Sequence, residues 1–162
     1  AEYKWTLFSR SRATAEYNEN VNNLFTGAYL NYTSKSGFGG TVLGTIATFG
    51  SGIDAGVHFF KNTESFMVYA LPTIAVKADL NYSWFSIMRF TPAINDHLKL
   101  YTSLEIFSNF DKFGHVAGVQ RMRIGLAING IQFGIAFNFS AAGEGYRITD
   151  TNPGLFIRKV FD

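Results

Sequence analysis

The chain has 162 residues and a net charge of +2, which fits a single domain over 1–162 and gives no electrostatic case for nucleic-acid binding. Charged residues make up 16% of the chain and aromatic residues 17%, whereas soluble domains carry roughly 25% charged residues. Cysteine is absent and the three histidines lack metal-ligand spacing, so neither a metal site nor another cofactor is expected.

No apolar run approaches the ~18 to 20 residues of a membrane helix. Turn signals instead divide the sequence into about ten segments of alternating polarity, which predict β-strands. The predicted strands lie near 3–16, 24–34, 41–49, 53–60, 65–76, 80–90, 97–107, 116–128, 131–140 and 153–161. Most have about the ~9 to 11 residues that a tilted membrane strand needs.

The dipeptide Asn129-Gly130 predicts the best-determined hairpin, because a type I′ turn needs positive φ at both central residues. Closing this turn pairs apolar with apolar residues on one face and small with basic residues on the other. The predicted pairs are Ile128–Ile131, Leu126–Phe133, Ile124–Ile135 and Met122–Phe137, alternating with Gly125–Gly134, Arg123–Ala136 and Arg121–Asn138. A slip of one residue would place arginine on the apolar face, so the register is strongly specified.

Two further turns sort their flanking strands in the same way. The turn at 77–79 predicts the pairs Phe66–Phe90, Val68–Met88, Pro72–Trp84, Ile74–Tyr82 and Val76–Leu80 on one face, and Met67–Arg89, Thr73–Ser83 and Ala75–Asn81 on the other. The turn at 50–52 predicts that Leu43, Ala47 and Phe49 share a face with Ile53, Ala55, Val57 and Phe59, opposite Asp54 and His58.

The charges fall on one face of these strands. That face holds Lys4, Arg10, Arg12, Arg89, Lys99, Arg121, Arg123 and Arg158 with the acids Glu16, Asp54 and Glu105, and only Lys159 lies on the bulky apolar face. A barrel with charges inside and apolar residues outside is typical of membranes. We therefore predict an all-β, antiparallel, up-and-down transmembrane β-barrel of about ten strands, with eight as the alternative.

The C-terminal run 155–161 resembles the closing strand of Gram-negative outer-membrane β-barrel proteins, which ends in an aromatic residue, although here Asp162 follows Phe161. The resemblance implies the bacterial outer membrane and its lipid as surroundings, with a signal peptide already removed before Ala1. If Asn129-Gly130 is periplasmic, the long connections predicted at 17–23, 108–115 and 141–152 lie outside. An aromatic girdle at the periplasmic end would then contain Tyr3, Trp5, Tyr32, Phe59, Phe66, Phe90 and Phe161.

Two groups of residues are candidates for function. The first is a charge cluster in the lumen: Arg10, Arg12, Glu16, Arg89, Lys99, Glu105, Arg121, Arg123 and Arg158, in which Arg158 on the last strand neighbours Arg10 and Arg12 on the first across the closing seam. The second is an outward surface of small and hydroxyl residues, suited to close approach by another membrane protein or a second copy. Its members are Ser9, Ser11, Ala13, Thr26, Ala28, Thr45, Ala47 and Ala55.

The sequence favours a non-enzymatic accessory or structural subunit of an outer-membrane assembly, its lumen filled by paired charges. Three alternatives stay open. One is a narrow anion-preferring pore, because bases outnumber acids on the charged face. Another is an outer-membrane hydrolase that would use His115 with Asp111 or Ser108 in a loop. The last is a soluble barrel of lipocalin type, which predicts an apolar interior.

Overall fold

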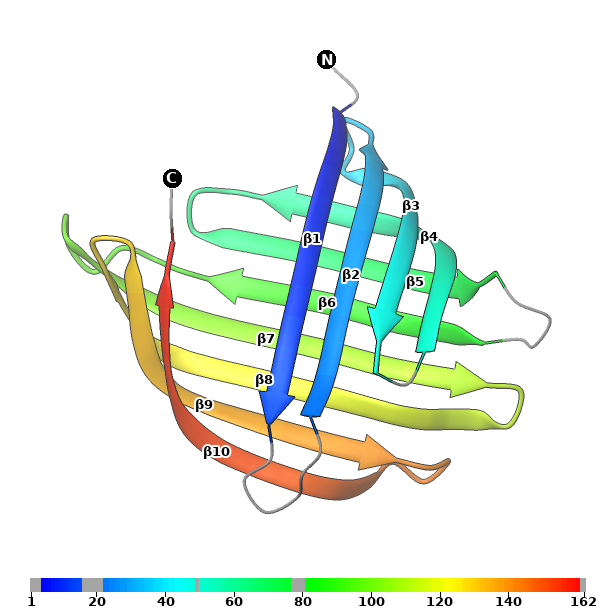
Figure 1. Ribbon diagram of the computed structural model, residues 1–162. Coiled ribbons are helices and arrows are strands. Elements are labelled where there is room, and N and C mark those ends of the chain that lie inside the picture. Colours follow the sequence, from blue (N-terminus) through cyan, green and yellow to red (C-terminus); the bar gives the residue numbers. More distant parts are fainter. Residues whose placement is uncertain (1–3, 16–21, 49, 77–80, 161–162) are drawn as a thin grey trace.

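The computed structural model describes residues 4–15, 22–48, 50–76 and 81–160, and these residues form ten strands (Figure 1). The strands are β1 (Lys4–Ala15), β2 (Asn22–Thr33), β3 (Phe38–Ala47), β4 (Gly50–Asn62), β5 (Phe66–Ala75), β6 (Tyr82–Phe90), β7 (Leu98–Asp111), β8 (Gly114–Ile128), β9 (Ile131–Ala142) and β10 (Arg147–Lys159). Among the described residues, no helix has the length and apolar character of a membrane span.

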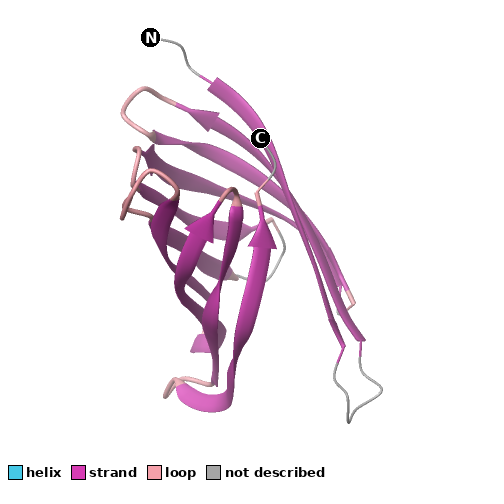
Figure 2. Ribbon diagram, turned by 90° about the vertical axis from the view of Figure 1, so that its left-hand side faces the viewer, coloured by secondary structure: helices cyan, strands magenta, loops and turns pink. Residues whose placement is uncertain are grey.

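The strands form one antiparallel sheet in the order β1 to β10, so each strand pairs with its neighbours in sequence. The predicted all-β, up-and-down architecture of ten strands is therefore confirmed. The sheet curls strongly, and β1 and β2 cross in front of β6 to β8 (Figures 1 and 2). It differs from the predicted barrel in one respect: it is open, because among the described residues β1 and β10 are each bonded on one side only.

The hairpin of β8 and β9 has the predicted register. Its ladder pairs Ile128 with Ile131 and continues through every pair expected from the turn, as far as Arg121 with Asn138. Asn129 and Gly130 have φ of 48° and 76°, the positive values of a type I′ turn. The ladder of β5 and β6 likewise contains each predicted pair from Phe66–Phe90 to Ile74–Tyr82. The predicted pair of Val76 with residue 80 lies outside the described residues.

The hairpin of β3 and β4 corrects the sequence prediction. β4 begins at Gly50, so Leu43 pairs with Asp54 and both point to the inner side of the curl. The predicted turn at 50–52 would pair Leu43 with Phe59, so the observed register differs from it by five residues, and this odd shift moves every side chain of β3 to the other face. Thr45 and Ala47 consequently face inward, and Val42 and Ile46 take the outward positions. Phe49 lies outside the described residues.

The connections do not have the predicted lengths. β7 ends at Asp111 and β8 begins at Gly114, and β9 and β10 are joined by only four residues, 143–146. The long connections expected at 108–115 and 141–152 are therefore wrong, and the one expected at 17–23 lies largely outside the described residues. At the opposite end, the connection between β6 and β7 spans 91–97. Loop length therefore gives no orientation for the sheet.

The buried apolar residues lie inside the curl, where strands far apart in sequence meet. Four of them form one cluster, Tyr29, Leu43, Leu71 and Phe85, with Tyr69 and Ile87 packed against it, whereas Tyr101 and Ala136 are buried outside this cluster. The clustered side chains come from β2, β3, β5 and β6, which fill the strongly curved part of the sheet. The charged residues of β1, β7 and β8 lie beside this cluster.

Candidate functional site

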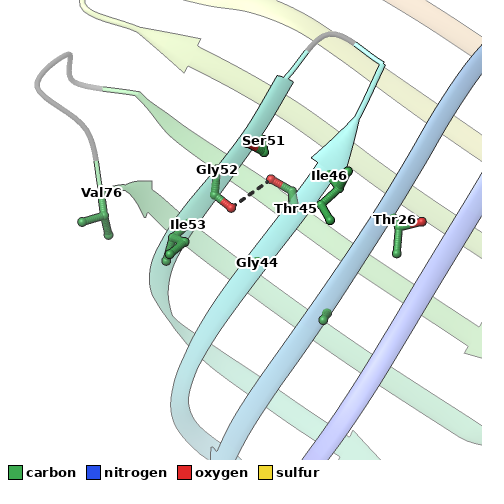
Figure 3. A pocket seen from close by; sticks show the side chains of 9 residues that line it. Thr26, Gly44, Thr45, Ile46, Ser51, Gly52, Ile53 and Val76 are labelled. Carbon is green, nitrogen blue, oxygen red and sulfur yellow. Dashed lines mark hydrogen bonds between the residues drawn. The ribbon is translucent and has the colours of Figure 1, made fainter.

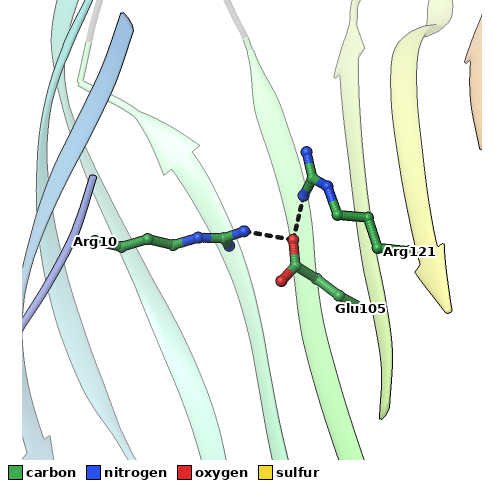
Figure 4. A network of polar contacts seen from close by, with 3 residues as sticks. All are labelled: Arg10, Glu105 and Arg121. Carbon is green, nitrogen blue, oxygen red and sulfur yellow. Dashed lines mark hydrogen bonds and ion pairs between the residues drawn. The ribbon is translucent and has the colours of Figure 1, made fainter. Parts of the chain in front are cut away.

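The centre of the inner face is an ion triad built on Glu105 of β7. Arg10 of β1 donates from Nη2 to Glu105 Oε1 over 2.5 Å, and Arg121 of β8 donates from Nη1 to the same oxygen (Figure 4). Glu105 is 5% exposed and Arg121 9%. Two guanidinium groups thus share the single negative charge of one buried carboxylate, so the triad keeps a net positive charge.

Local and long-range structure both contribute to the triad. Glu105 and Arg121 are direct partners in the ladder of β7 and β8, so strand register alone brings them together. Arg10 lies on the edge strand β1, far from β7 in the strand order of the sheet. Its guanidinium carbon also lies 5.3 Å from the ring centre of Phe85 on β6. This cation–π contact and the ion pair connect β1 to β6 and β7 across the interior of the curl.

A second group of basic residues lies toward the end of the sheet that carries Asn129-Gly130. Arg89, Ser103 and Arg123 are consecutive partners across β6, β7 and β8, so their side chains form one inward row. Arg89 Nε and Ser103 Oγ are buried and have no hydrogen-bond partner. Lys99 and Arg158 lie beyond this row on the same face and are exposed.

A pair of glycines connects β10 to this interior. Gly125 and Gly134 face each other across β8 and β9, between Tyr101 of β7 and Phe156 of β10. Since neither glycine carries a side chain, the two rings lean over them and their centroids lie 5.5 Å apart. Arg158 Nη1 then donates to Tyr101 Oη over 3.4 Å. Tyr101 is only 1% exposed, so this contact anchors the last strand.

The structure brings together part of the predicted lumen cluster. Arg10, Glu105 and Arg121 meet. Arg10 and Arg158 do not, because β1 and β10 are not paired in the open sheet; Arg10 binds Glu105 and Arg158 binds Tyr101. Arg12 points to the same side as Arg10 but is exposed. Glu16 lies outside the described residues.

A polar network around His58 was missed by the sequence analysis. Thr41 Oγ1 donates to Asn31 Oδ1 over 2.7 Å and lies 2.7 Å from His58 Nδ1, while Thr33 Oγ1 lies 2.8 Å from His58 Nε2. Because the Thr41 proton is used on Asn31, Nδ1 of His58 donates to Thr41 and Nε2 accepts from Thr33. The network is complete and buried, since His58 is 2% exposed. The inward position of His58 was a signal for it, but the misplaced β3 register put Thr41 on the other face.

The structure brings the residues of the alternative hydrolase together only in part. Ser108 and His115 both flank Gly118, where an added Cβ would lie 3.1 Å from Ser108 Oγ and 3.0 Å from His115 Nε2. His115 lies on β8 rather than in a loop, and its Nδ1 is 2.9 Å from the carbonyl oxygen of Gly143. Its ring stacks on Tyr146 at 4.0 Å, and Nε2 is buried without a partner. Asp111 Oδ1 accepts from the backbone of Phe113 instead. Among the described residues, no group of three or more potential ligands could hold a metal ion.

The outward surface of small residues is partly as predicted. Its central row consists of Ser9, Ala28 and Gly44, which are consecutive ladder partners across β1, β2 and β3. In the next outward pair of β1 and β2, Thr26 Oγ1 donates to Ser11 Oγ. A Cβ added at Gly44 would meet no atom within 4 Å. A shallow groove of about 530 Å³ opens over these strands (Figure 3). Ile46 of β3, Ile53 of β4 and Val76 also line it.

The predicted members of this surface divide by strand. Those on the outward face are Ser9, Ser11, Ala13, Thr26, Ala28 and Ala55. Thr45 and Ala47 belong to the inner face by register, and Thr45 Oγ1 donates to the carbonyl of Gly52 over 3.3 Å. Thr45 nevertheless remains among the residues that line the groove. Gly40 and Gly44 replace them as small outward residues of β3.

Comparisons with known proteins add no relative: no family model, no curated protein and no solved structure matches this chain.

Proposed function

We propose that the chain is an integral protein of a Gram-negative outer membrane, where it acts as a non-enzymatic structural subunit. The observation that carries the proposal is the inverted distribution of side chains. Glu105, Arg121 and His58 are buried, whereas Leu155 and Ile157 of β10 are 86% and 80% exposed. The interior holds an apolar cluster as well, but a soluble barrel of lipocalin type would not bury an ion triad and expose an apolar outer face, which lipid suits better than water.

The aromatic residues of the outer face support the same proposal. Trp5 and Tyr32 lie with ring centroids 4.8 Å apart, and Phe38 and Phe59 with centroids 4.9 Å apart. All four lie at one end of their strands, the end shared by the β8–β9 turn. Aromatic rings at one level of a barrel are typical of the boundary between lipid and water. Tyr3 and Phe161, which were predicted to join them, lie outside the described residues.

Extraction of isolated membranes tests this location. Washing with concentrated salt is expected to leave the protein in the membrane pellet, because its apolar outer face would bind lipid through hydrophobic contacts, which salt does not screen. A non-ionic detergent should then release it as a folded protein. Release by salt alone would overturn the membrane proposal, whatever the function of the inner face.

The open edges bear on the proposed state in lipid. Unpaired backbone groups in hydrocarbon cost several kcal/mol each, and β1 and β10 each have one free side. We therefore infer that these edges are covered in the membrane, by each other in a closed barrel or by another chain. Their inward side chains allow closure, since Arg12 of β1 and Arg158 of β10 would point into a hydrated interior.

The groove over β2 to β4 supports the role of a subunit. Ser9, Ala28 and Gly44 form a row without bulk, so another transmembrane surface can come close to the backbone there. Small residues at such contacts permit packing and hydrogen bonds that lipid tails do not provide. We propose that the occupant is a different membrane protein of the same assembly.

Photo-crosslinking checks this surface. A photoreactive residue at Ser11 or Ala28 is expected to yield an adduct with another membrane polypeptide in intact cells. Ile135 on β9 is the matched control, because it faces outward among bulky residues and should yield lipid adducts only. Lipid adducts alone at all three positions would exclude the docking role and leave the membrane location unaffected.

A further inference from the structure

The row of Arg89, Ser103 and Arg123 has the composition of a binding site rather than of a structural ion network. The three residues are direct partners on β6, β7 and β8. Neighbouring strands lie about 4.8 Å apart, which places the two arginine backbones roughly 10 Å apart on either side of Ser103. Both guanidinium groups can therefore reach a small molecule held above the serine hydroxyl.

Two hydrogen-bond donors of this row have no acceptor within the described part of the protein. Arg89 Nε and Ser103 Oγ are buried without a hydrogen-bond partner, and Ser103 is only 6% exposed. A buried donor without a partner costs free energy, and more so if it is charged. The inner face also holds a buried acceptor without a partner, Gln132 Oε1, but Gln132 lies four residues along β9 from Ala136, the ladder partner of Arg123. The row thus presents donors that await an acceptor.

No carboxylate balances the charge of the row. Among the described residues, both ion pairs go to Glu105 Oε1, where Arg10 and Arg121 already bind. Arg89 and Arg123 flank Ser103 on the two neighbouring strands, so these two positive charges repel each other with no acidic ladder partner between them. An anion placed between the arginines would remove this repulsion and supply the missing acceptor.

We propose that Arg89, Ser103 and Arg123 bind a small oxyanion, of the class of phosphate, sulfate or a carboxylate. Planar guanidinium groups match the geometry of such oxygens and donate two parallel hydrogen bonds to them. The Ser103 hydroxyl donates a further one from the floor of the site. Lys99 and Arg158, which are exposed on the same face, attract the anion toward it. The site goes beyond the structural role proposed above and does not depend on the membrane location.

Binding of inorganic phosphate to the purified full chain tests the site. Thermal unfolding in sodium phosphate is compared with sodium chloride at equal ionic strength, and the affinity is measured by titration calorimetry. Phosphate is expected to raise the unfolding temperature above that in chloride. Arg89→Gln and Arg123→Gln should each weaken phosphate binding at least tenfold, since each removes a charged donor. The matched control is Arg147→Gln on exposed β10, which removes the same charge outside the row and should leave the affinity unchanged.

A second signature separates a binding site from general charge. In chloride, Arg89→Gln should keep or raise the unfolding temperature, because it removes a charged group without a partner. In phosphate, the order should reverse, with the wild type the more stable. Ser103→Ala keeps every charge and nearly the same volume, so it tests the site even if an arginine variant fails to fold; it should weaken binding several-fold.

Three results would overturn the proposal. One is equal stability of the wild type in phosphate and chloride. Another is a loss of affinity in Arg147→Gln as large as that in Arg89→Gln, which would indicate a diffuse charge effect. The third is unchanged affinity in Ser103→Ala together with unchanged affinity in Arg123→Gln. None of these results would alter the proposed membrane location.

Discussion

Replacing Glu105 by glutamine is expected to lower the free energy of unfolding by about 3–5 kcal/mol, the usual loss when one partner of a buried ion pair is removed. Glu105 is 5% exposed and is the acceptor for both Arg10 and Arg121. Its neutralisation leaves two guanidinium groups facing each other without a counter-charge. Unfolding in urea of protein reconstituted in phosphatidylcholine vesicles measures the difference.

Glu64→Gln is the matched control for this variant. Glu64 lies exposed in the connection between β4 and β5, so the same change should shift stability by no more than about 0.5 kcal/mol. Adding Arg121→Gln to Glu105→Gln should cost less than the sum of the two single changes, because the second change removes a charge that the first left unpaired. Equal stability of the Glu105 and Glu64 variants would show that the ion triad does not hold β1 against β7.

The hairpins that the sequence predicted correctly have a local signal for their register. Asn129-Gly130 requires one turn type, and the arginines at 121 and 123 exclude the alternative faces of β8. The same argument worked for β5 and β6, where Arg89 must face inward. In both hairpins a charged side chain makes a slip of one residue costly.

The β3–β4 hairpin shows where this reasoning fails. β3 carries no charge, and three glycines and two threonines give its two faces similar polarity. The Gly-rich segment 50–52 looked like the turn, yet these residues begin β4 and pair with 45–47. Without a charged or bulky marker, alternation alone did not determine the register. The error placed Thr45 and Ala47 on the wrong face and hid the contacts of His58.

The candidate site could be predicted only in its local part. Strand alternation placed Glu105, Arg121 and Arg89 on one face, and neighbouring strands then fix which of them are partners. The contact between Arg10 and Glu105 joins residues 95 positions apart and depends on how strongly the sheet curls. The missing acceptors of Arg89 and Ser103 depend on the positions of side-chain atoms. Neither property has a signal in the spacing of the sequence.

Closure of the sheet is expected to be detectable with engineered cysteines, because the chain has no cysteine of its own. Ser9 on β1 and the residues 155 and 157 on β10 all face outward. If β1 and β10 pair in lipid, Ser9→Cys combined with Leu155→Cys or with Ile157→Cys should form a disulfide within one chain in membrane vesicles. A loop of roughly 150 residues closed in this way stabilises a folded chain by about 5 kcal/mol in the chain-entropy model. Migration on non-reducing gels and urea unfolding with and without reductant measure both effects.

Ser9→Cys with Ile135→Cys is the control for this experiment. Ile135 also faces outward, but β10 lies between it and the free edge, so closure should keep it out of disulfide range of Ser9. Disulfides between chains, in place of those within one chain, would mean that a second copy covers the edges. If no pair forms a disulfide while the protein stays membrane-bound, another protein must cover them, because lipid cannot satisfy the free backbone groups of two long strands. The edge strands β1 and β10 would then belong to the same docking surface as the groove over β2 to β4.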